Sequence, residues 1–222
     1  MTDLVERLRA IGRDRYHDKH PFHVAMHDGK LSRDAVRAWV LNRHYYQTRI
    51  PIKDALIVSK SEDRVFRRMW IRRVHDHDDV GGGLDQWEKL AEGVGLDVAK
   101  VRSGSDVLPG VRFACDAYVT FVREHSLLEA VASSLTEFFA PDLMRTRIAA
   151  WEKHYTWVDT TVLDYFRGRP AKATNDSGEA LDFVLTHATT SRDQDACVSA
   201  LATKCDILWV QLDAIDLACT GA

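Results

Sequence analysis

Apolar residues recur along most of the chain at steps of three and four, the spacing that gathers side chains on one face of an α-helix. Convincing runs of alternating apolar and polar residues, typical of β-strands, do not occur. The pattern therefore predicts an all-α protein, a single compact multi-helix bundle. The clearest stripe lies near the end of the sequence and consists of Leu201, Cys205, Leu208, Leu212, Ile215 and Cys219.

Proline, glycine and short polar stretches divide these stripes into segments. We expect helices over 32–50 and 63–77, with a new helix starting at Pro51 because proline lacks the N–H that a helix interior needs. Gly81, Gly82 and Gly83 are expected to interrupt the chain, and Pro170 to end a helix. The polar stretch 171–178 is predicted to be a loop.

The composition is ordinary for a globular protein of 222 residues, with 45% hydrophobic and 28% charged residues. The length and the absence of a linker predict one domain over 1–222. A net charge of −3 offers no basic field for nucleic acid or for a membrane surface. Since no stretch resembles a signal peptide or a membrane span, we expect a cytoplasmic protein.

Several predicted helices carry polar groups on the face that should be apolar. Arg43 and Gln47 share one stripe, and Arg73 and His77 share another, each pair four residues apart. A buried arginine is costly unless something anionic meets it. For any single arginine, an internal acidic partner and a bound ligand both remain open. Polar positions of the same kind elsewhere are Lys53, Tyr118, Arg147, Tyr165, Arg169 and Lys204.

Taken together, the four arginines at 43, 73, 147 and 169 favour a binding pocket over four separate ion pairs. The arginine fork matches carboxylates in bidentate geometry. The predicted ligand is therefore a small molecule with several carboxylates. His77 on one of these stripes can act as a general base or acid, although a histidine near a helix end, taken alone, is more often structural.

Histidines offer two apparent metal motifs. In the run from His75 to Asp79, positions 75 and 77 point about 200° apart on a helix and cannot share one ion. The steps between His17, His20, His23 and His27 suit a metal better, but Pro21 interrupts a regular helical face. We therefore expect no metal site, with a haem or metal ligand among the latter four as the alternative.

Many short strings in the same order match a known family over nearly the whole length. The chain resembles the pyrroloquinoline quinone synthase (PqqC) family. The matching strings include Asn42-Arg43, Tyr45-Tyr46-Gln47-Thr48, Lys53-Asp54-Ala55, Asp76-His77-Asp78, Leu108-Pro109-Gly110-Val111-Arg112, Ser133-Ser134-Leu135-Thr136-Glu137 and Tyr165-Phe166-Arg167.

The resemblance implies a haem-oxygenase-like bundle of about seven helices that is usually a homodimer. It also implies an oxidase that closes a ring and oxidises a bicyclic amino-quinone precursor to pyrroloquinoline quinone. Dioxygen is the acceptor, hydrogen peroxide is the product, and neither a metal nor an organic cofactor takes part. The precursor carries several carboxylates, in agreement with the ligand predicted from the arginines.

The resemblance also assigns roles to residues of this chain. His77 corresponds to the principal proton-transfer residue, and Tyr165 and Arg169 to the group that handles dioxygen or peroxide. The expected ligand contacts are Tyr16, His17, Arg43, Gln47, Lys53, Arg73, Tyr118, Glu137, Arg147 and Lys204.

One position departs from the family pattern. Met144 stands where the family has a histidine that joins the oxygen-handling group, and a thioether cannot relay a proton. The departure supports an alternative function, a related protein that binds or carries a quinone, or acts on a related substrate, without full oxidase activity. A thiaminase-like hydrolase would need a nucleophilic cysteine in the pocket, for which Cys115 lies on the wrong flank of its helix.

Overall fold

The computed structural model describes residues 2–221, and these residues form α-helices and short 3-10 helices without a strand. The all-α prediction is confirmed. Seven of the described α-helices have eleven or more residues, in agreement with the expected number. The elements are α1 (Thr2–Arg15), η1 (His17–Lys19), α2 (Pro21–His27), α3 (Arg33–Ser59), α4 (Arg64–Trp70), α5 (Arg72–Asp78), α6 (Gly83–Gly93), α7 (Val98–Ser103), α8 (Pro109–Glu124), α9 (Leu127–Ser133), η2 (Ser134–Phe138), α10 (Ala140–His154), η3 (Thr160–Leu163), α11 (Asp164–His187) and α12 (Ser191–Thr220).

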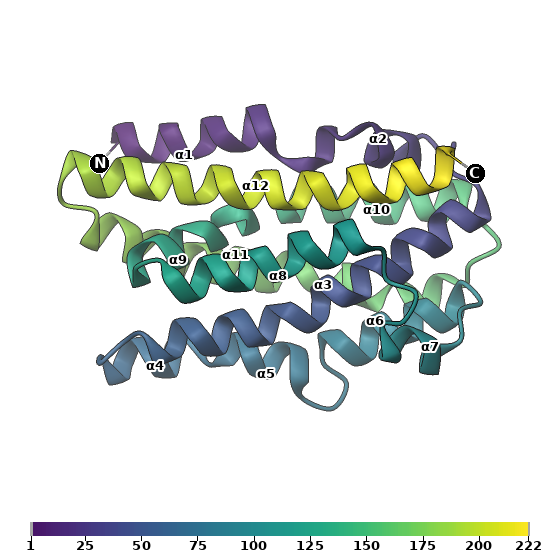
Figure 1. The fold of residues 1–222 in the computed structure, drawn as a ribbon, viewed down its shortest axis with the longest axis horizontal. Helices are drawn as coiled ribbons and strands as arrows, with labels where there is room; N and C mark the ends of the chain where they lie inside the picture. The colour runs from purple at the N-terminus through teal and green to yellow at the C-terminus, as the bar shows by residue number, and fades with distance from the viewer. Residues whose placement is uncertain (1, 222) are drawn as a thin grey trace.

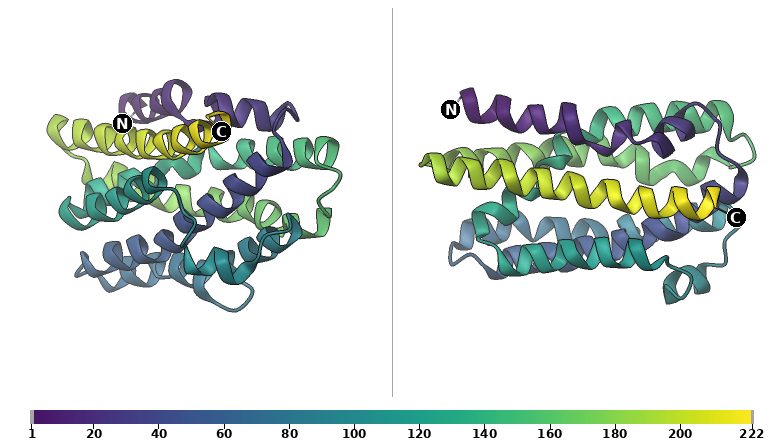
Figure 2. Two further views of the ribbon diagram at one scale, coloured as in Figure 1. Left: turned by 45° about the vertical axis from the view of Figure 1, so that its right-hand side comes forward. Right: turned by 45° about the horizontal axis from the view of Figure 1, so that its top comes forward.

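The helices form an elongated bundle in which α3 crosses the long axis obliquely (Figure 1). Helices α1 and α12 lie side by side along one edge, and α4 to α7 lie along the opposite edge. Two further views keep this arrangement, with α10 and α11 as a packed pair (Figure 2). Helix α3 contacts α5, α6, α8 and α12, so its side chains reach several partners at once.

Four large aromatic residues from four helices meet beside the N-terminal part of α3. The ring of Trp39 lies 5.4 Å from Trp87, 6.1 Å from Trp151 and 6.3 Å from Phe166, measured between centroids. All four side chains are buried. Tilted and edge-on contacts of this kind contribute beyond the area that they bury. The aromatic cluster therefore fixes α3, α6, α10 and α11 relative to one another.

The prediction that a helix ends before Pro51 is wrong, because α3 continues through this proline to Ser59. Proline removes one backbone hydrogen bond and disfavours helical geometry in the residue before it. Both halves of α3 nevertheless bury side chains, including Gln47 on one side of the proline and Asp54 and Ile57 on the other. Burial of both halves outweighs the local cost of the proline.

The predicted loop at 171–178 is also wrong, as is the predicted helix end at Pro170, since both lie inside α11. The polar residues of this stretch favour turns locally. However, Ala173 and Ala180 are fully buried, and Asp176 is buried against Arg73. Tertiary contacts have overridden local propensity here.

The interruption predicted at 81–83 is confirmed at its centre. Helix α5 ends at Asp78 and α6 begins at Gly83, and Gly81 adopts a positive φ of 79° that favours glycine. The predicted helix over 63–77 is divided in two at Ile71, between α4 and α5. Across residues 2–221, none of the helices combines the length and the apolarity needed to cross a bilayer.

Candidate active site

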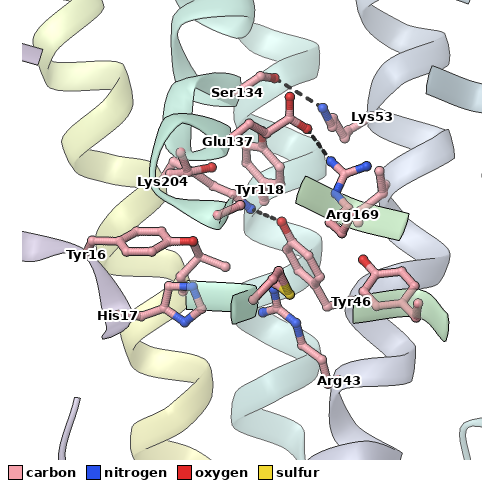
Figure 3. A pocket seen from close by; sticks show the side chains of 16 residues that line it. Tyr16, His17, Arg43, Tyr46, Lys53, Tyr118, Ser134, Glu137, Arg169 and Lys204 are labelled. Atoms are coloured by element: carbon pink, nitrogen blue, oxygen red, sulfur yellow. Dashed lines mark hydrogen bonds and ion pairs between the residues drawn. The ribbon is translucent and has the colours of Figure 1, made fainter. Parts of the chain in front are cut away.

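A small, partly open cavity, called the chamber below, lies where α3, α8, α10, α11, α12 and η2 meet the segment around η1 (Figure 3). Its volume is about 70 Å³. The chamber is lined by Tyr16, His17, Arg43, Tyr46, Ile50, Lys53, Tyr118, Ser134, Thr136, Glu137, Ala140, Met144, Tyr165, Arg169, Lys204 and Leu208.

Helix α3 supplies one wall of the chamber. Arg43, Tyr46, Ile50 and Lys53 follow one another at steps of three and four, so they lie on one helical face. The polar stripe predicted from the sequence is therefore the wall of a cavity. The opposite side comes from Lys204 of α12 and from Tyr16 and His17 (Figure 3).

Nine of the thirteen predicted site residues line the chamber, and four lie behind its wall. Gln47 accepts a hydrogen bond from the Tyr165 hydroxyl, with 2.9 Å between the oxygens, and so holds that side chain in place. Arg147 donates to Nε2 of His23 at 3.2 Å. Arg73 and His77 also lie outside the lining.

Two of the predicted cations share one acidic partner. Glu137 accepts hydrogen bonds from Arg73 at 2.8 Å and from Arg169 at 2.6 Å. Although burial opposes its charge, these arginines hold the pKa of Glu137 below its ordinary value. Arg73 also donates to the backbone carbonyl of Asp176. For Arg73 and Arg169 the internal acidic partner, one of the two interpretations left open, is present.

Lys53 is neutralised in the same way by its neighbour Asp54, with 2.6 Å between Nζ and Oδ1. Its ammonium also donates to the hydroxyl of Ser134 at 3.1 Å. Burial lowers the pKa of Lys53, but Asp54, Tyr118 and Glu137 together outweigh it and leave this pKa raised. Lys53 is therefore a cation whose charge is met before any ligand arrives.

Three other cations have no carboxylate within ion-pair distance among residues 2–221: Arg43, Arg147 and Lys204. Arg43 donates to Gln211 at 3.3 Å and lies 3.8 Å from the centre of the Tyr46 ring. Lys204 is 2% exposed, donates to the Tyr46 hydroxyl at 2.8 Å and lies 3.4 Å from the centre of the Tyr118 ring. Their partners are dipoles and aromatic faces, which stabilise a buried cation less than an anion does.

The lack of an acidic partner is reflected in the pKa values of Lys204 and Arg147. Burial, with Arg43 and Lys53 adding, holds the pKa of Lys204 well below its ordinary value. Burial, with Arg43 adding, lowers the pKa of Arg147 to about 9. An anionic ligand in the chamber would reverse both effects, since it favours the charged form. This side of the chamber is built for an anion.

Aromatic rings supply much of the remaining wall. Tyr16, Tyr46, Tyr118 and Tyr165 all line the chamber, and His17 packs edge-on against Tyr16 with 4.5 Å between ring centroids. Rings of this kind offer flat apolar faces as well as polar tips. The combination suits a planar ligand with anionic groups at its edge.

His77 is buried in α5 and its Nδ1 lies 3.2 Å from the backbone oxygen of Arg73. Because a carbonyl can only accept, Nδ1 carries the proton and Nε2 carries the lone pair. Nε2 has no hydrogen-bond partner among the described residues. Burial, with the charge of Arg169 adding, lowers the pKa of His77 to about 4. The imidazole is thus neutral at pH 7 and able to accept a proton.

Sequence reasoning did not select Tyr46 or Ser134 as site residues. Tyr46 lies on the same helical face as Arg43 and Ile50, so the spacing contained the signal. Ser134 is the first residue of the 3-10 helix η2, and no helical spacing of polar residues in the sequence indicated it. Both accept hydrogen bonds from lysines of the chamber. Among residues 2–221, three or more His, Cys, Asp or Glu side chains nowhere converge as metal ligands would.

Residues 5–214 match the sequence model of the TENA/THI-4/PQQC family. The chain belongs to this family. The pyrroloquinoline-quinone synthase of Rhizobium meliloti is 54% identical over 212 residues, 94% of this chain and 83% of that protein. The protein of the same name from Ruegeria pomeroyi is 52% identical over 216 residues, 96% of this chain and 90% of that protein.

Similarity to solved structures concerns the fold. A domain of unknown function with a heme oxygenase-like fold from Shewanella denitrificans matches with a TM-score of 0.78 and 14% identity. The match covers 100% of this chain and 94% of that one. The expected haem-oxygenase-like fold is confirmed.

We predict opposite effects on stability for two lysines of the chamber. Lys204→Met removes a buried charge without an acidic partner and should raise the free energy of unfolding by about 1 kcal/mol. Lys53→Met leaves the buried Asp54 carboxylate without its partner and should lower it by about 3 kcal/mol. Urea unfolding of the two variants measures both changes. Equal destabilisation by both would mean that Lys204 is neutralised by a group of the protein.

We also predict that stability falls as the pH is lowered from about 6.5 to about 4. Over this range the unfolded chain protonates its histidine at position 77, whereas the folded protein does not. His77 alone should account for roughly 3 kcal/mol of this loss. Thermal unfolding at several pH values should show a shallower slope for His77→Gln. The exposed His75→Gln is the matched control and should keep the wild-type slope.

Proposed function

We propose that this protein is a pyrroloquinoline-quinone synthase. It would close a further ring on a bicyclic amino-quinone precursor and oxidise it with dioxygen, releasing hydrogen peroxide, without a metal or organic cofactor. The observation that carries the proposal is a set of three cations around an aromatic chamber, the buried Arg147 and Lys204 and the half-buried Arg43, that lack acidic partners among residues 2–221. Relatives of that name at 50–54% identity support it.

The unmet cations would bind the carboxylates of the precursor. Arg43 and Lys204 line the chamber directly, and Arg147 adds positive charge from behind the wall. The same fixed charges would stabilise the negative charge that develops as the ring system loses protons and passes electrons to oxygen. Tyr46 and Tyr118 would hold the rings between their faces.

His77 would be the principal proton acceptor through Nε2. In this structure Tyr165 and Arg169 stand between His77 and the chamber, since they line both the chamber and the cavity that contains His77. A precursor carboxylate competes with Glu137 for Arg169. We therefore expect ligand binding to move Arg169 and to bring His77 into contact with the substrate. Closure around the ligand would also exclude water from reactive intermediates.

A second candidate function rests on Met144, which lines the chamber at a point where a proton relay would be useful. A thioether can pack against a ligand but cannot relay protons. A protein of this kind would bind or carry the quinone, or act on a related substrate, without completing the oxidations.

The protein would act in the cytoplasm as a single domain over 1–222 and as a homodimer. Its partner would be a small quinone with several carboxylates, and neither nucleic acid nor a membrane would be involved.

Oxygen uptake by protein stripped of metals is the decisive experiment. With the bicyclic precursor, the wild-type protein should consume dioxygen, release peroxide and give the absorption spectrum of the quinone product. Activity that appears only after iron is restored would replace the proposal with a metal oxidase. Tight quinone binding without a single turnover would establish the carrier function instead.

We predict that His77→Ala folds normally and slows turnover by roughly two orders of magnitude or more. The imidazole would no longer be available to accept protons from the bound ring system. Single-turnover absorbance changes measure the effect, and the exposed His75→Ala is the control for a nearby histidine. Wild-type rates in His77→Ala would remove this residue from the mechanism.

A further inference from the structure

A second, smaller cavity lies behind the chamber and is called the side cavity. Its volume is about 40 Å³. Tyr165 and Arg169 line both cavities, so these two side chains form part of the wall between the two spaces. His77 lines the side cavity and not the chamber.

The side cavity reaches the surface at its other end. Gly168 of α11 lines it and is exposed, and Gln86 of α6 lines it from across the opening. Lys172 and Asp76 form an ion pair of 2.8 Å between partly exposed side chains at the same place. The exposed end of this small cavity is therefore edged by polar side chains.

The inner end of the side cavity is chemically specific. His77 is 3% exposed, and its Nε2 has no hydrogen-bond partner among the described residues. A buried polar atom without a partner is costly, and water or another small molecule normally satisfies it. Arg169 adds a positive charge next to it. The site suits a small oxygen species that forms or carries negative charge.

The chamber has a much wider neighbour on the side of Tyr16. A groove of about 420 Å³ shares Tyr16 with the chamber and carries Arg9, Arg13 and Lys19, together with Asp18 and Asp142. The groove has room for a planar ligand, whereas the side cavity is far smaller. The two neighbours of the chamber thus differ about tenfold in volume.

We propose that the side cavity is the passage by which dioxygen reaches the bound substrate and hydrogen peroxide leaves. The inference rests on the proposed oxidase function. A substrate that fills the chamber blocks the wide side, and yet dioxygen must arrive while the substrate stays bound. Dioxygen is small and uncharged, so a small cavity admits it. Peroxide leaves past His77 and Arg169, which can hydrogen-bond to it.

Blocking the opening at Gly168 tests the passage. An added Cβ at Gly168 meets no atom within 4 Å, so Gly168→Leu should fold, and it adds bulk at the exposed end of the side cavity. Gly178 lies on the same helix, is exposed and has equally open space, but it is remote from the side cavity. Gly178→Leu is therefore the matched control for a leucine in α11.

We expect Gly168→Leu to lower kcat/KM for dioxygen by roughly tenfold at saturating precursor, because access and not chemistry is slowed. Affinity for the quinone should stay at the wild-type value, and Gly178→Leu should match wild type in both measurements. Gln86→Trp, which blocks the same opening from α6, should repeat the effect and decides the test if Gly168→Leu does not fold.

Unchanged oxygen dependence in folded Gly168→Leu and Gln86→Trp would overturn the passage. An equal fall in kcat/KM for dioxygen in the control Gly178→Leu would also overturn it. Failure of the proposed function is distinguishable, since the wild-type protein would then consume no dioxygen with the precursor.

Discussion

Buried positive charge that exceeds the nearby negative charge is the constraint on which the site depends. Arg43, Arg147 and Lys204 have only dipoles and aromatic rings for partners among residues 2–221. Such an arrangement costs stability in the ligand-free protein, and the surrounding helices must be rigid enough to hold it. The aromatic cluster around Trp39 supplies that rigidity, and Arg147 lies directly over the Trp39 ring. A multi-carboxylate ligand would recover the cost on binding.

Charge is distributed unevenly across the chamber, and this asymmetry would orient a ligand. Glu137 forms ion pairs with both Arg73 and Arg169 on one side, and Asp54 forms an ion pair with Lys53 nearby. The opposite side has no such acids. A ligand that carries anions at one edge is therefore oriented as well as bound. Arg169 lines both the chamber, where the ligand would bind, and the side cavity, which His77 also lines.

Helical periodicity predicted the fold class well because each long helix has one apolar face that must be buried. The failures occurred at Pro51 and at 171–178, where local rules favour a break. Burial of side chains on both sides of each point continues the helix regardless. A sequence pattern records which residues prefer to break a helix, but not how much packing energy opposes them.

The sequence by itself determined the all-α bundle, the polar stripe of α3 and the family, because these depend on spacing and on strings of residues. It also identified nine of the thirteen predicted site residues as neighbours in one chamber, and four of these nine are cations: Arg43, Lys53, Arg169 and Lys204. Tertiary structure alone decided which cations are neutralised, since Glu137 meets Arg73 across 64 positions of sequence. It also decided that His77 lies in a cavity of its own, because that depends on where Tyr165 and Arg169 stand between helices distant in the chain.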